Sequence, residues 1–537
     1  MESPTGTSEL NLPHGLAYAD LYGREGLLRI DALFLEQLRA SDAGLAGRLS
    51  EARAAGGIAD ALAESEFLLA LAPHLEDFLS RLFGIETEFR RLAEAQNKLA
   101  PLFACKRLFV QRQAVKTYKE AEAESFDGDA LKSDLERRIG GKFDELGFAR
   151  AVMAWREDEA ANAEPLSVAE KYAAWATLSA KGKARHKHGI LFKVPHKIDP
   201  YRLVPIEHAA HAAHDGVSVM RLPDEKLRRR EGFALTDPGT DLEGALDNAA
   251  YCIYCAHQGK DSCSKGLFEK SGGFKKSAFG HVLTGCPLEE KISEMNELEA
   301  AGHTLGALAM VVVDNPMLAG TGHRICNDCM KSCIYQKQEP VDIPQIETRV
   351  LRDSLRLPWG FEIYGLLTRW NPINLARPFP KASIGYKVLV VGLGPAGYTL
   401  SHHLMNDGHT VVDIDGLKIE PLAPEFSGVT AQGARVPFKP IRDLSELAEN
   451  LDERAMAGFG GVAEYGITVR WDKNFLKVIR LLIERRAEFA MFGGVRFGGT
   501  ITVESAFAMG FDHIALCAGA GRPTFVAMSY FFGMCVV

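Results

Sequence analysis

A cluster of cysteines constrains the fold of this chain more than any other feature. Seven of its ten cysteines fall between residues 252 and 333: Cys252, Cys255, Cys263, Cys286, Cys326, Cys329 and Cys333. A two-residue gap lets two thiolates point from a tight turn at one metal centre, and a cysteine a few residues later can add a third corner. In a long chain that opens with a polar segment, such a cluster is more typical of metal binding than of disulfides. The sequence therefore predicts a metal-binding domain.

Spacing alone leaves two kinds of metal centre open. The C-x2-C-x3-C run at 326–333 is typical of three thiolates on one iron–sulfur cube, and Cys286 followed by proline resembles the fourth cysteine of ferredoxin-like runs. Seven thiolates are one short of two complete four-ligand sites. A histidine could supply the eighth ligand of two zinc sites, and the candidates are His257, His281, His303 and His323. We favour iron–sulfur and keep zinc as the alternative.

A second motif follows the cysteines, where residues 387–397 read KVLVVGLGPAG. An apolar strand runs into a G-x-G-x-x-G turn, and the residues after it have a helical pattern. In such a turn Gly392 makes the bend, Gly394 lets backbone amides approach a pyrophosphate, and Gly397 lets the helix pack closely on the strand. Pro395 and Ala396 complete the turn. The motif predicts a Rossmann-like nucleotide-binding unit.

Features downstream agree with this interpretation. The segment 408–415 is predicted as the next strand, and Asp415 at its end can accept hydrogen bonds from a ribose hydroxyl. A later apolar strand, Phe511–Cys517, leads into a glycine turn that contains Gly519 and Gly521. The segment 474–492 is predicted to be a helix.

Both motifs resemble one known family. In this order, they resemble the glutamate synthase small (beta) subunit and the N-terminal part of dihydropyrimidine dehydrogenase, which are FAD and iron–sulfur pyridine-nucleotide oxidoreductases. The matching pieces are Cys252–Cys263, Gly285–Leu288, Asn315-Pro316, Gly322–Cys326, Cys329, Cys333, Pro340–Glu347, the glycine turn at 392–397 and the segments 459–470 and 511–523.

The resemblance implies two [4Fe–4S] clusters with crossed ligation. One cluster would take Cys252, Cys255, Cys263 and Cys333, and the other would take Cys286, Cys326, Cys329 and an oxygen ligand that falls on Glu347. The competing interpretation of Glu347 is an acidic residue in the first turn of a helix that runs to Arg352, where the helix dipole favours a negative charge. The resemblance also implies FAD at Gly392, Gly394, Pro395, Ala396, Gly397, Asp415, Gly519 and Gly521.

The implied function is that of an FAD-dependent electron-transfer oxidoreductase. Electrons would pass between NAD(P)H, FAD and the two clusters to an unknown partner. In the family, an NAD(P)H domain and a second FAD segment follow, but neither is recognisable before Val537. We therefore expect a redox partner protein or a further subunit. A zinc-structured adaptor and a flavin-binding fragment without activity of its own remain the alternatives.

The whole chain is predicted to be multidomain. We expect a mainly helical N-terminal region over 1–238, with helices near 58–79 and 85–102, and a helical two-cluster iron–sulfur domain over 239–353. A connector over 354–384 leads to the first segment of an α/β Rossmann-like FAD-binding domain over 385–537. Residues 190–238 are expected to form loops and short strands, and we interpret His208, His211 and His214 there as structural rather than metal-binding.

Charge and hydropathy limit the kinds of partner that this chain is expected to have. The formal net charge of −8 argues against a general nucleic-acid binder. No apolar run reaches the roughly 18 residues that a membrane helix needs, so we expect a cytoplasmic protein without a membrane span. The basic run Lys181–Lys197 is interpreted as a solvated loop, with an anion site as the alternative.

Overall fold

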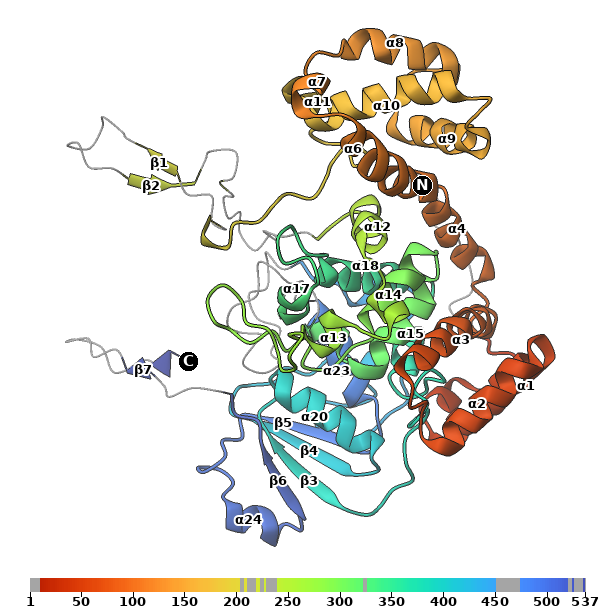
Figure 1. Cartoon of the computed structure of the whole chain (residues 1–537). Helices are drawn as coiled ribbons and strands as arrows, with labels where there is room; N and C mark the ends of the chain where they lie inside the picture. The colour runs from red at the N-terminus through yellow and green to blue at the C-terminus, as the bar shows by residue number, and fades with distance from the viewer. Residues whose placement is uncertain are drawn as a thin grey trace.

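The computed structural model describes residues 10–202, 207–209, 219–222, 227, 239–321, 326–450, 474–519, 524–525 and 535–536. Helices make up most of the chain before residue 370, and a small parallel sheet follows near the C-terminus (Figure 1). The chain is therefore multidomain, with a helical N-terminal region as predicted. Within the described residues, no helix combines the length and the apolar character needed to cross a membrane.

Three helices begin the described chain after the short η1 (Tyr18–Leu21): α1 (Arg24–Ser41), α2 (Ala43–Ala55) and α3 (Ala61–Leu82). The carboxylates of Asp42 and Asp60 each accept a first-turn amide at 2.8 Å, which explains where α2 and α3 begin. Phe67 and Leu71 of α3 are fully buried, because apolar side chains recur every three or four residues on one face. Helix α3 packs on α15 (Thr304–Asp314), which belongs to the region of the clustered cysteines.

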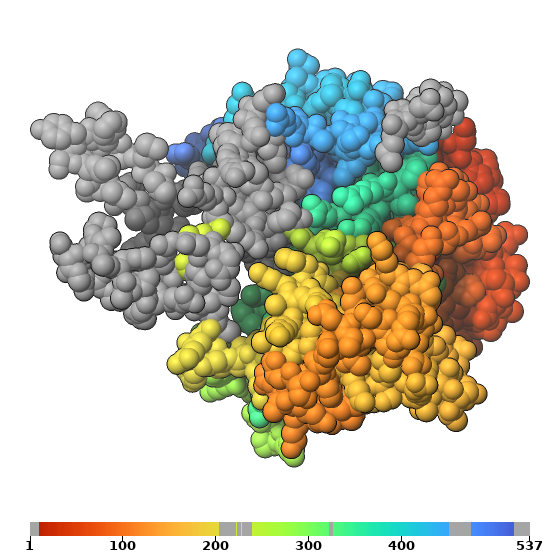
Figure 2. Space-filling view, turned by 90° about the horizontal axis from the view of Figure 1, so that it is seen from above, coloured from red at the N-terminus to blue at the C-terminus, as the bar shows by residue number. Residues whose placement is uncertain are grey.

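A second helical unit has a hydrophobic core of its own. Its elements, after the linking helix α4 (Glu86–Asn97), are α5 (Ala100–Cys105), the π-helical η2 (Lys106–Ala114), α6 (Val115–Thr117), α7 (Glu120–Ala123), α8 (Gly128–Ile139), α9 (Glu145–Trp155), η3 (Arg156–Asp158), α10 (Ala163–Leu178) and α11 (Ala180–Arg185). Phe148 and Tyr172 lie at the centre of this core, and Cys105 is buried in it. Figures 1 and 2 show this unit (orange to yellow) and the sheet (blue) on opposite sides of the cysteine region (green).

Short helices and turns build the cysteine region. Its elements are α12 (Leu242–Tyr251), η6 (Cys255–Gln258), α13 (Ser262–Lys265), α14 (Ile292–Ala300), α15 (Thr304–Asp314), α16 (Leu318–Thr321), α17 (Asp328–Ser332), α18 (Ile343–Arg356) and α19 (Gly360–Leu367). Before it lie η4 (Pro200–Arg202) and the antiparallel pair β1 (Glu207–Ala209) and β2 (Val219–Arg221), which agree with the predicted short strands. His208 lies in β1, whereas His211 and His214 fall outside the described residues.

Four parallel strands form the sheet, in the order β5-β4-β3-β6. They are β3 (Lys387–Val391), β4 (Thr410–Asp415), β5 (Phe489–Gly493) and β6 (His513–Leu516), and α20 (Pro395–Asn406) connects β3 to β4. The remaining elements are α21 (Pro424–Ser427), η7 (Leu444–Leu447), α23 (Phe475–Glu484), α24 (Val503–Ala508), β7 (Thr524–Phe525) and β8 (Cys535–Val536). Val388 and Val390 belong to the main core, whereas Leu389 and Val391 face Ala506 of α24, as strand alternation requires.

The predicted helix over 474–492 is wrong in its second half. Helix α23 ends at Glu484, and Phe489–Gly493 is strand β5, which pairs with β4. The tertiary partner decides the outcome, because a helix continued to residue 492 would leave the edge of β4 without this pairing. Short apolar runs do not distinguish a buried strand from a buried helix by periodicity alone.

A buried ion network joins the N-terminal segment, the cysteine region and the sheet. The guanidinium of Arg485, just after α23, donates from Nη1 to Glu362 Oε1 of α19 at 3.0 Å. The same nitrogen donates to the hydroxyl oxygens of Tyr18 at 3.0 Å and Tyr22 at 2.8 Å. The Arg485 and Glu362 side chains are 0% and 1% exposed. Because water is excluded from both charges, the ion pair and the hydrogen bonds around it compensate them.

Candidate functional site

Four cysteines from distant parts of the sequence gather in one buried place, and we call them the first cysteine set: Cys252, Cys255, Cys263 and Cys333. Cys252 follows α12, Cys255 begins η6, Cys263 lies in α13 and Cys333 follows α17. All four are buried, with at most 8% exposed. Cys263 is hydrogen-bonded to Cys333, and the charges of Cys252 and Cys333 both act on Cys255. The structure thus brings together the four residues assigned to one cluster.

Backbone turns and one buried carboxylate position this set. Tyr254, inside the C-x2-C turn, has a φ of +52°, and its amide donates to the Cys252 sulfur at 3.4 Å. Asp261 accepts the amide of Cys263 at 3.1 Å through Oδ1 and the amide of Ser293 at 3.2 Å through Oδ2. Asp261 therefore both caps α13 and ties it to α14.

The protein environment opposes ionisation of most of these thiols. Burial raises the pKa of Cys252 to about 11 and that of Cys255 to about 12. The hydrogen bond between Cys263 and Cys333 raises the pKa of Cys263 well above its ordinary value and lowers the pKa of Cys333 to about 7. Thiolates at the other three positions would need a positive centre among them, because burial penalises the charged form.

A second group lies next to the first, and we call it the second cysteine set: Cys286, Cys329, Glu290 and Glu347. The amide of Cys286 donates to the carbonyl oxygen of Cys263 at 2.8 Å, so the two sets adjoin. Burial and the charge of Glu290 raise the pKa of Cys286 to about 12. Burial, then the charges of Glu347 and Cys286, raise the pKa of Cys329 strongly. Two sulfurs and two carboxyl groups therefore lie close together, and all of them are buried except the half-buried Cys286.

Glu347 is not an acidic residue of a first helical turn, so that competing interpretation is wrong. Helix α18 begins at Ile343, which places Glu347 beyond its first turn, where the residue is 7% exposed. Burial and the negative charge of Glu290 raise the pKa of Glu347 well above its ordinary value. The pKa of Glu290 is raised to about 7 by burial. A macrodipole effect at the helix start does not explain a carboxyl group in this position.

Cys326 is separate from the buried residues of the second set. It is exposed, and its thiol donates to Asp328 Oδ2 at 3.5 Å. His323 lies outside the described residues. In the ranges that the structure describes, no three histidine, cysteine, aspartate or glutamate side chains are arranged so that they could hold one metal ion.

The glycine turn joins β3 to α20 at the carboxyl end of the sheet. Gly392 has a φ of +104°, and a Cβ there would lie 2.5 Å from the carbonyl oxygen of Cys517 at the end of β6. A Cβ on Gly397 would overlap the carbonyl oxygen of Gly392. At Gly394, by contrast, an added Cβ would meet no atom within 4 Å. Two glycines are therefore needed for packing, and the third faces open space, where a phosphate group could approach.

Asp415 supports this turn from the end of β4. Its Oδ2 accepts the amide of Leu393 at 3.0 Å, and its Oδ1 accepts the amide of Leu417 at 2.8 Å. The residue is 8% exposed. A carboxylate has further lone pairs for a ribose hydroxyl, but its first task here is to position the glycine turn.

The remaining predicted site residues are only partly described. Pro395 begins α20, Ala396 is exposed beside it, and Gly519 has a φ of +81° close to the end of β6. Gly521 and the segment 459–470 lie outside the described residues. The cysteine region reaches the turn through α16, because a Cβ on Gly320 would collide with the hydroxyl of Tyr398 in α20.

Sequence reasoning missed two carboxylates, Glu290 and Asp261. Glu290 is 4% exposed, and Asn315 donates to its Oε1 at 2.9 Å. Two sequence features point to Glu290: it closely follows Cys286-Pro287, and its partner Asn315 belongs to one of the matching pieces. Neither feature is specific, because only the structure shows that the two side chains are in contact.

Comparison with known proteins gives a family model and several relatives. The model of the RP005 N-terminal alpha-helical domain matches residues 12–84, which contain α1 to α3. Uncharacterized protein RP006 of Rickettsia prowazekii is 52% identical over 215 residues, which are 40% of this chain and 29% of RP006. The glutamate synthase [NADPH] small chain of Mycobacterium tuberculosis (strain ATCC 25618 / H37Rv) is 32% identical over 128 residues, and that of Bacillus subtilis is 30% identical over 130 residues.

Each glutamate synthase match covers 24% of this chain and 23% of the relative, so the likeness to an oxidoreductase subunit is distant and concerns a fragment. Uncharacterized protein RP005 of Rickettsia prowazekii is 32% identical over 289 residues, which are 51% of this chain and 94% of RP005. Because nearly all of RP005 is matched, the chain belongs to the RP005 family.

Proposed function

We propose that this chain is an electron-transfer oxidoreductase module that binds FAD and two [4Fe–4S] clusters. The first cysteine set carries the proposal, because Cys252 and Cys255, Cys263, and Cys333 come from three separate segments and bring four buried thiols together. Four sulfur donors in a buried place suit an iron–sulfur cube, and the positive iron centres would compensate thiolates that burial otherwise disfavours. The distant likeness to glutamate synthase small chains supports the same class of protein.

The two sets would have different tasks. Cys252, Cys255, Cys263 and Cys333 would hold one cluster through sulfur alone. Cys286 and Cys329 would hold the other, with Cys326 moving inward from the surface and Glu347 supplying an oxygen ligand. Glu290, which lies beside Glu347, would hold or release a proton when that carboxylate binds. A harder oxygen ligand and this nearby carboxyl group would give the second cluster a different potential.

The glycine turn would hold the flavin. Open space in front of Gly394 allows the pyrophosphate to approach the amides that begin α20, whose dipole favours a negative charge. Asp415 would keep the turn in place and accept a ribose hydroxyl. When bound, FAD exchanges two electrons with a nicotinamide and single electrons with iron–sulfur clusters.

A nicotinamide site and the final electron acceptor are assigned to a partner. Neither the described sheet nor the glycine turn provides a second dinucleotide site of the same pattern. NAD(P)H would reach the flavin of this chain through a redox partner protein or a further subunit.

Paired cysteine variants test the proposal. Cys263→Ser and Cys286→Ser each remove one ligand of a different set, so each should lose about half of the iron while retaining the signal of the other cluster in electron paramagnetic resonance. Cys105→Ser, buried in the core of the second helical unit, is the matched control and should keep all of it. Full iron retention in both set variants would refute the cluster assignment.

A further inference from the structure

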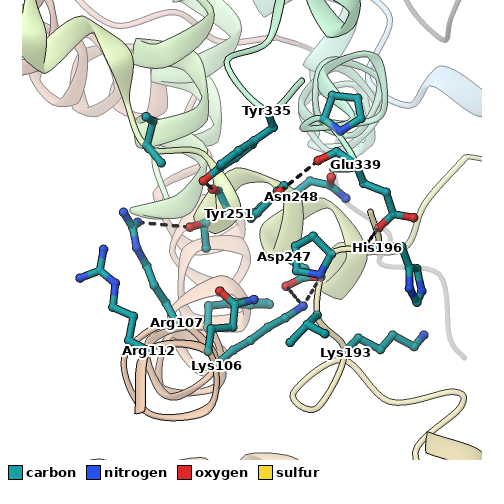
Figure 3. Close-up of a pocket in the computed structure, with 17 residues that line it drawn as sticks. Lys106, Arg107, Arg112, Lys193, His196, Asp247, Asn248, Tyr251, Tyr335 and Glu339 are labelled. Carbon is teal, nitrogen blue, oxygen red and sulfur yellow. Dashed lines mark hydrogen bonds and ion pairs between the residues drawn. The ribbon is translucent and has the colours of Figure 1, made fainter. Parts of the chain in front are cut away.

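A pocket of about 430 Å³ lies between the second helical unit and the cysteine region (Figure 3). Its lining comes from η2, from the loop 193–196, from α12 with the residues after it, and from the segment 335–340. No residue of the glycine turn and no predicted cluster ligand lines it. The volume falls within the range of about 300–1,000 Å³ of small-molecule sites.

The lining carries an excess of positive charge. Four cationic side chains, from Lys106, Arg107, Arg112 and Lys193, stand against the carboxylates of Asp247 and Glu339. The ammonium of Lys106 donates to both oxygens of Asp247, at 2.6 and 2.7 Å, so these two charges cancel. Three cations remain against one carboxylate, which leaves two positive charges in excess.

These three cations are available to a ligand. The Nη1 of Arg107 donates to the backbone carbonyls of Ala250 and Cys252, both at 3.4 Å, and neither oxygen carries a full charge. Among the described residues, none of Arg107, Arg112 and Lys193 forms an ion pair. Figure 3 shows the two arginines on one side of the opening and Lys193 on the other. An anion inside would meet positive charge from both sides.

The winding of η2 explains why the two arginines share one wall. Residues Lys106–Ala114 form a π-helix, in which residues five apart follow one another on consecutive turns. Arg107 and Arg112 are five apart, whereas in an α-helix such residues point roughly 140° away from each other. Segments with π-helical winding are rare and occur frequently at functional sites. The π-helical winding therefore indicates a functional site at this pocket independently of the charges.

An aromatic wall completes the pocket beside the first cysteine set. The rings of Tyr251 and Tyr335 stack with centroids 4.5 Å apart and an interplanar angle of 11°. Tyr335 lies close enough to Cys333 and Cys252 for their charges to act on its hydroxyl. An organic ligand would therefore find cations for its charged groups and ring surface for its carbon frame.

We infer that this pocket binds a small organic anion with two negative charges, carried by a phosphate or by two carboxylates. Only part of the basic run Lys181–Lys197 lines this pocket. Lys193 and His196 line the pocket, whereas Lys187 is exposed and does not. The anion site that was the alternative for this run thus concerns only its last part. The inference does not depend on bound FAD or clusters.

Calorimetric titration of the full chain with inorganic pyrophosphate and, separately, with succinate tests the inference. One or both should bind the pocket with saturation, and the preferred probe identifies phosphate or dicarboxylate as the ligand class. Arg112→Ala combined with Lys193→Ala should weaken that binding at least about tenfold, because two charge-assisted contacts are lost. Both side chains are exposed, so the fold should be kept, and thermal unfolding checks this.

Two variants serve as controls. Lys187→Ala removes the same charge from the same basic run outside the pocket and should leave the affinity unchanged. Gly394→Val blocks the glycine turn, where pyrophosphate could also bind. This variant should leave the affinity of the pocket for the preferred probe unchanged. The inference is overturned if neither probe shows saturable binding, or if the double variant binds the preferred probe as tightly as Lys187→Ala does.

Discussion

The cysteine region and the glycine-turn sheet are built in opposite ways. In the sheet, the candidate glycine turn lies directly between a regular strand and a helix, and two of its glycines are fixed by contacts within a few residues or with the adjacent strand. In the cysteine region, the sulfurs lie in or between short helices and turns that are far apart in the sequence, and tertiary packing brings them together. One half of the candidate site is therefore encoded locally, whereas the other half depends on the packing of the whole core.

The largest effect is expected at the junction between the two regions. Arg485→Met should cost about 3–5 kcal/mol of unfolding free energy, because it leaves the buried Glu362 without its cation. Chemical denaturation measures this cost. The control, Arg137→Ala, removes one partner of an exposed ion pair and should cost less than about 1 kcal/mol. Equal costs for the two variants would mean that the network does not hold the regions together.

Within the sheet, the glycines separate packing from ligand access. Gly397→Ala should cost about 1–3 kcal/mol, because the new methyl group overlaps the carbonyl oxygen of Gly392. Gly394→Ala meets open space and should cost no more than about 1 kcal/mol, and the bulkier Gly394→Val should abolish flavin retention while leaving the iron content unchanged. Unfolding curves and flavin absorbance provide the two measurements. Flavin retained by Gly394→Val at the parent level would exclude the turn as the site.

Buried acids should give the cysteine region a distinctive pH dependence. Burial raises the pKa of Glu299 in α14 to about 8, whereas an unfolded glutamate titrates near about 4.3. The folded state therefore holds one proton more between these values, and its stability falls as pH rises through this window, by at most about 1.4 kcal/mol per pH unit. Glu299→Gln should flatten the decline measured by urea unfolding from pH 5 to pH 8. An unchanged slope would show that Glu299 is not its source.

The smallest effect is expected at Asp415. Asp415→Asn keeps one oxygen acceptor but loses the charge and the second acceptor, so flavin binding should weaken by about 1–2 kcal/mol. Fluorescence titration with FAD measures the change. A loss as complete as in Gly394→Val would instead indicate that the carboxylate is essential for the turn itself.

The contrast between the sheet and the cysteine region also explains which elements the sequence can predict. Strand β3, helix α20 and strand β4 follow from local alternation and from the glycine spacing, and all three lie where they were expected. Strand β5 was missed, because only its pairing with β4 distinguishes it from the end of a helix. Of the buried pair Glu290 and Glu347, the sequence predicts only Glu347 as a site residue. No local pattern reveals that residues 57 positions apart lie side by side.

The pocket beside η2 was beyond sequence reasoning for a related reason. A π-helix has no sequence signature comparable to the heptad or the glycine turn, so the shared wall of Arg107 and Arg112 becomes visible only in three dimensions. The basic run that contains Lys193 was recognised, but its partners lie in segments more than 50 residues away.

The content of iron, sulfide, zinc and flavin in anaerobically purified protein tests whether this chain binds two iron–sulfur clusters and FAD. Two cubes predict about eight irons and eight sulfides per chain, with absorbance near about 400 nm. The variants Cys263→Ser and Cys286→Ser should each lose one of the two clusters and keep the other. Stoichiometric zinc without labile sulfide would contradict the electron-transfer account and favour a zinc-structured adaptor.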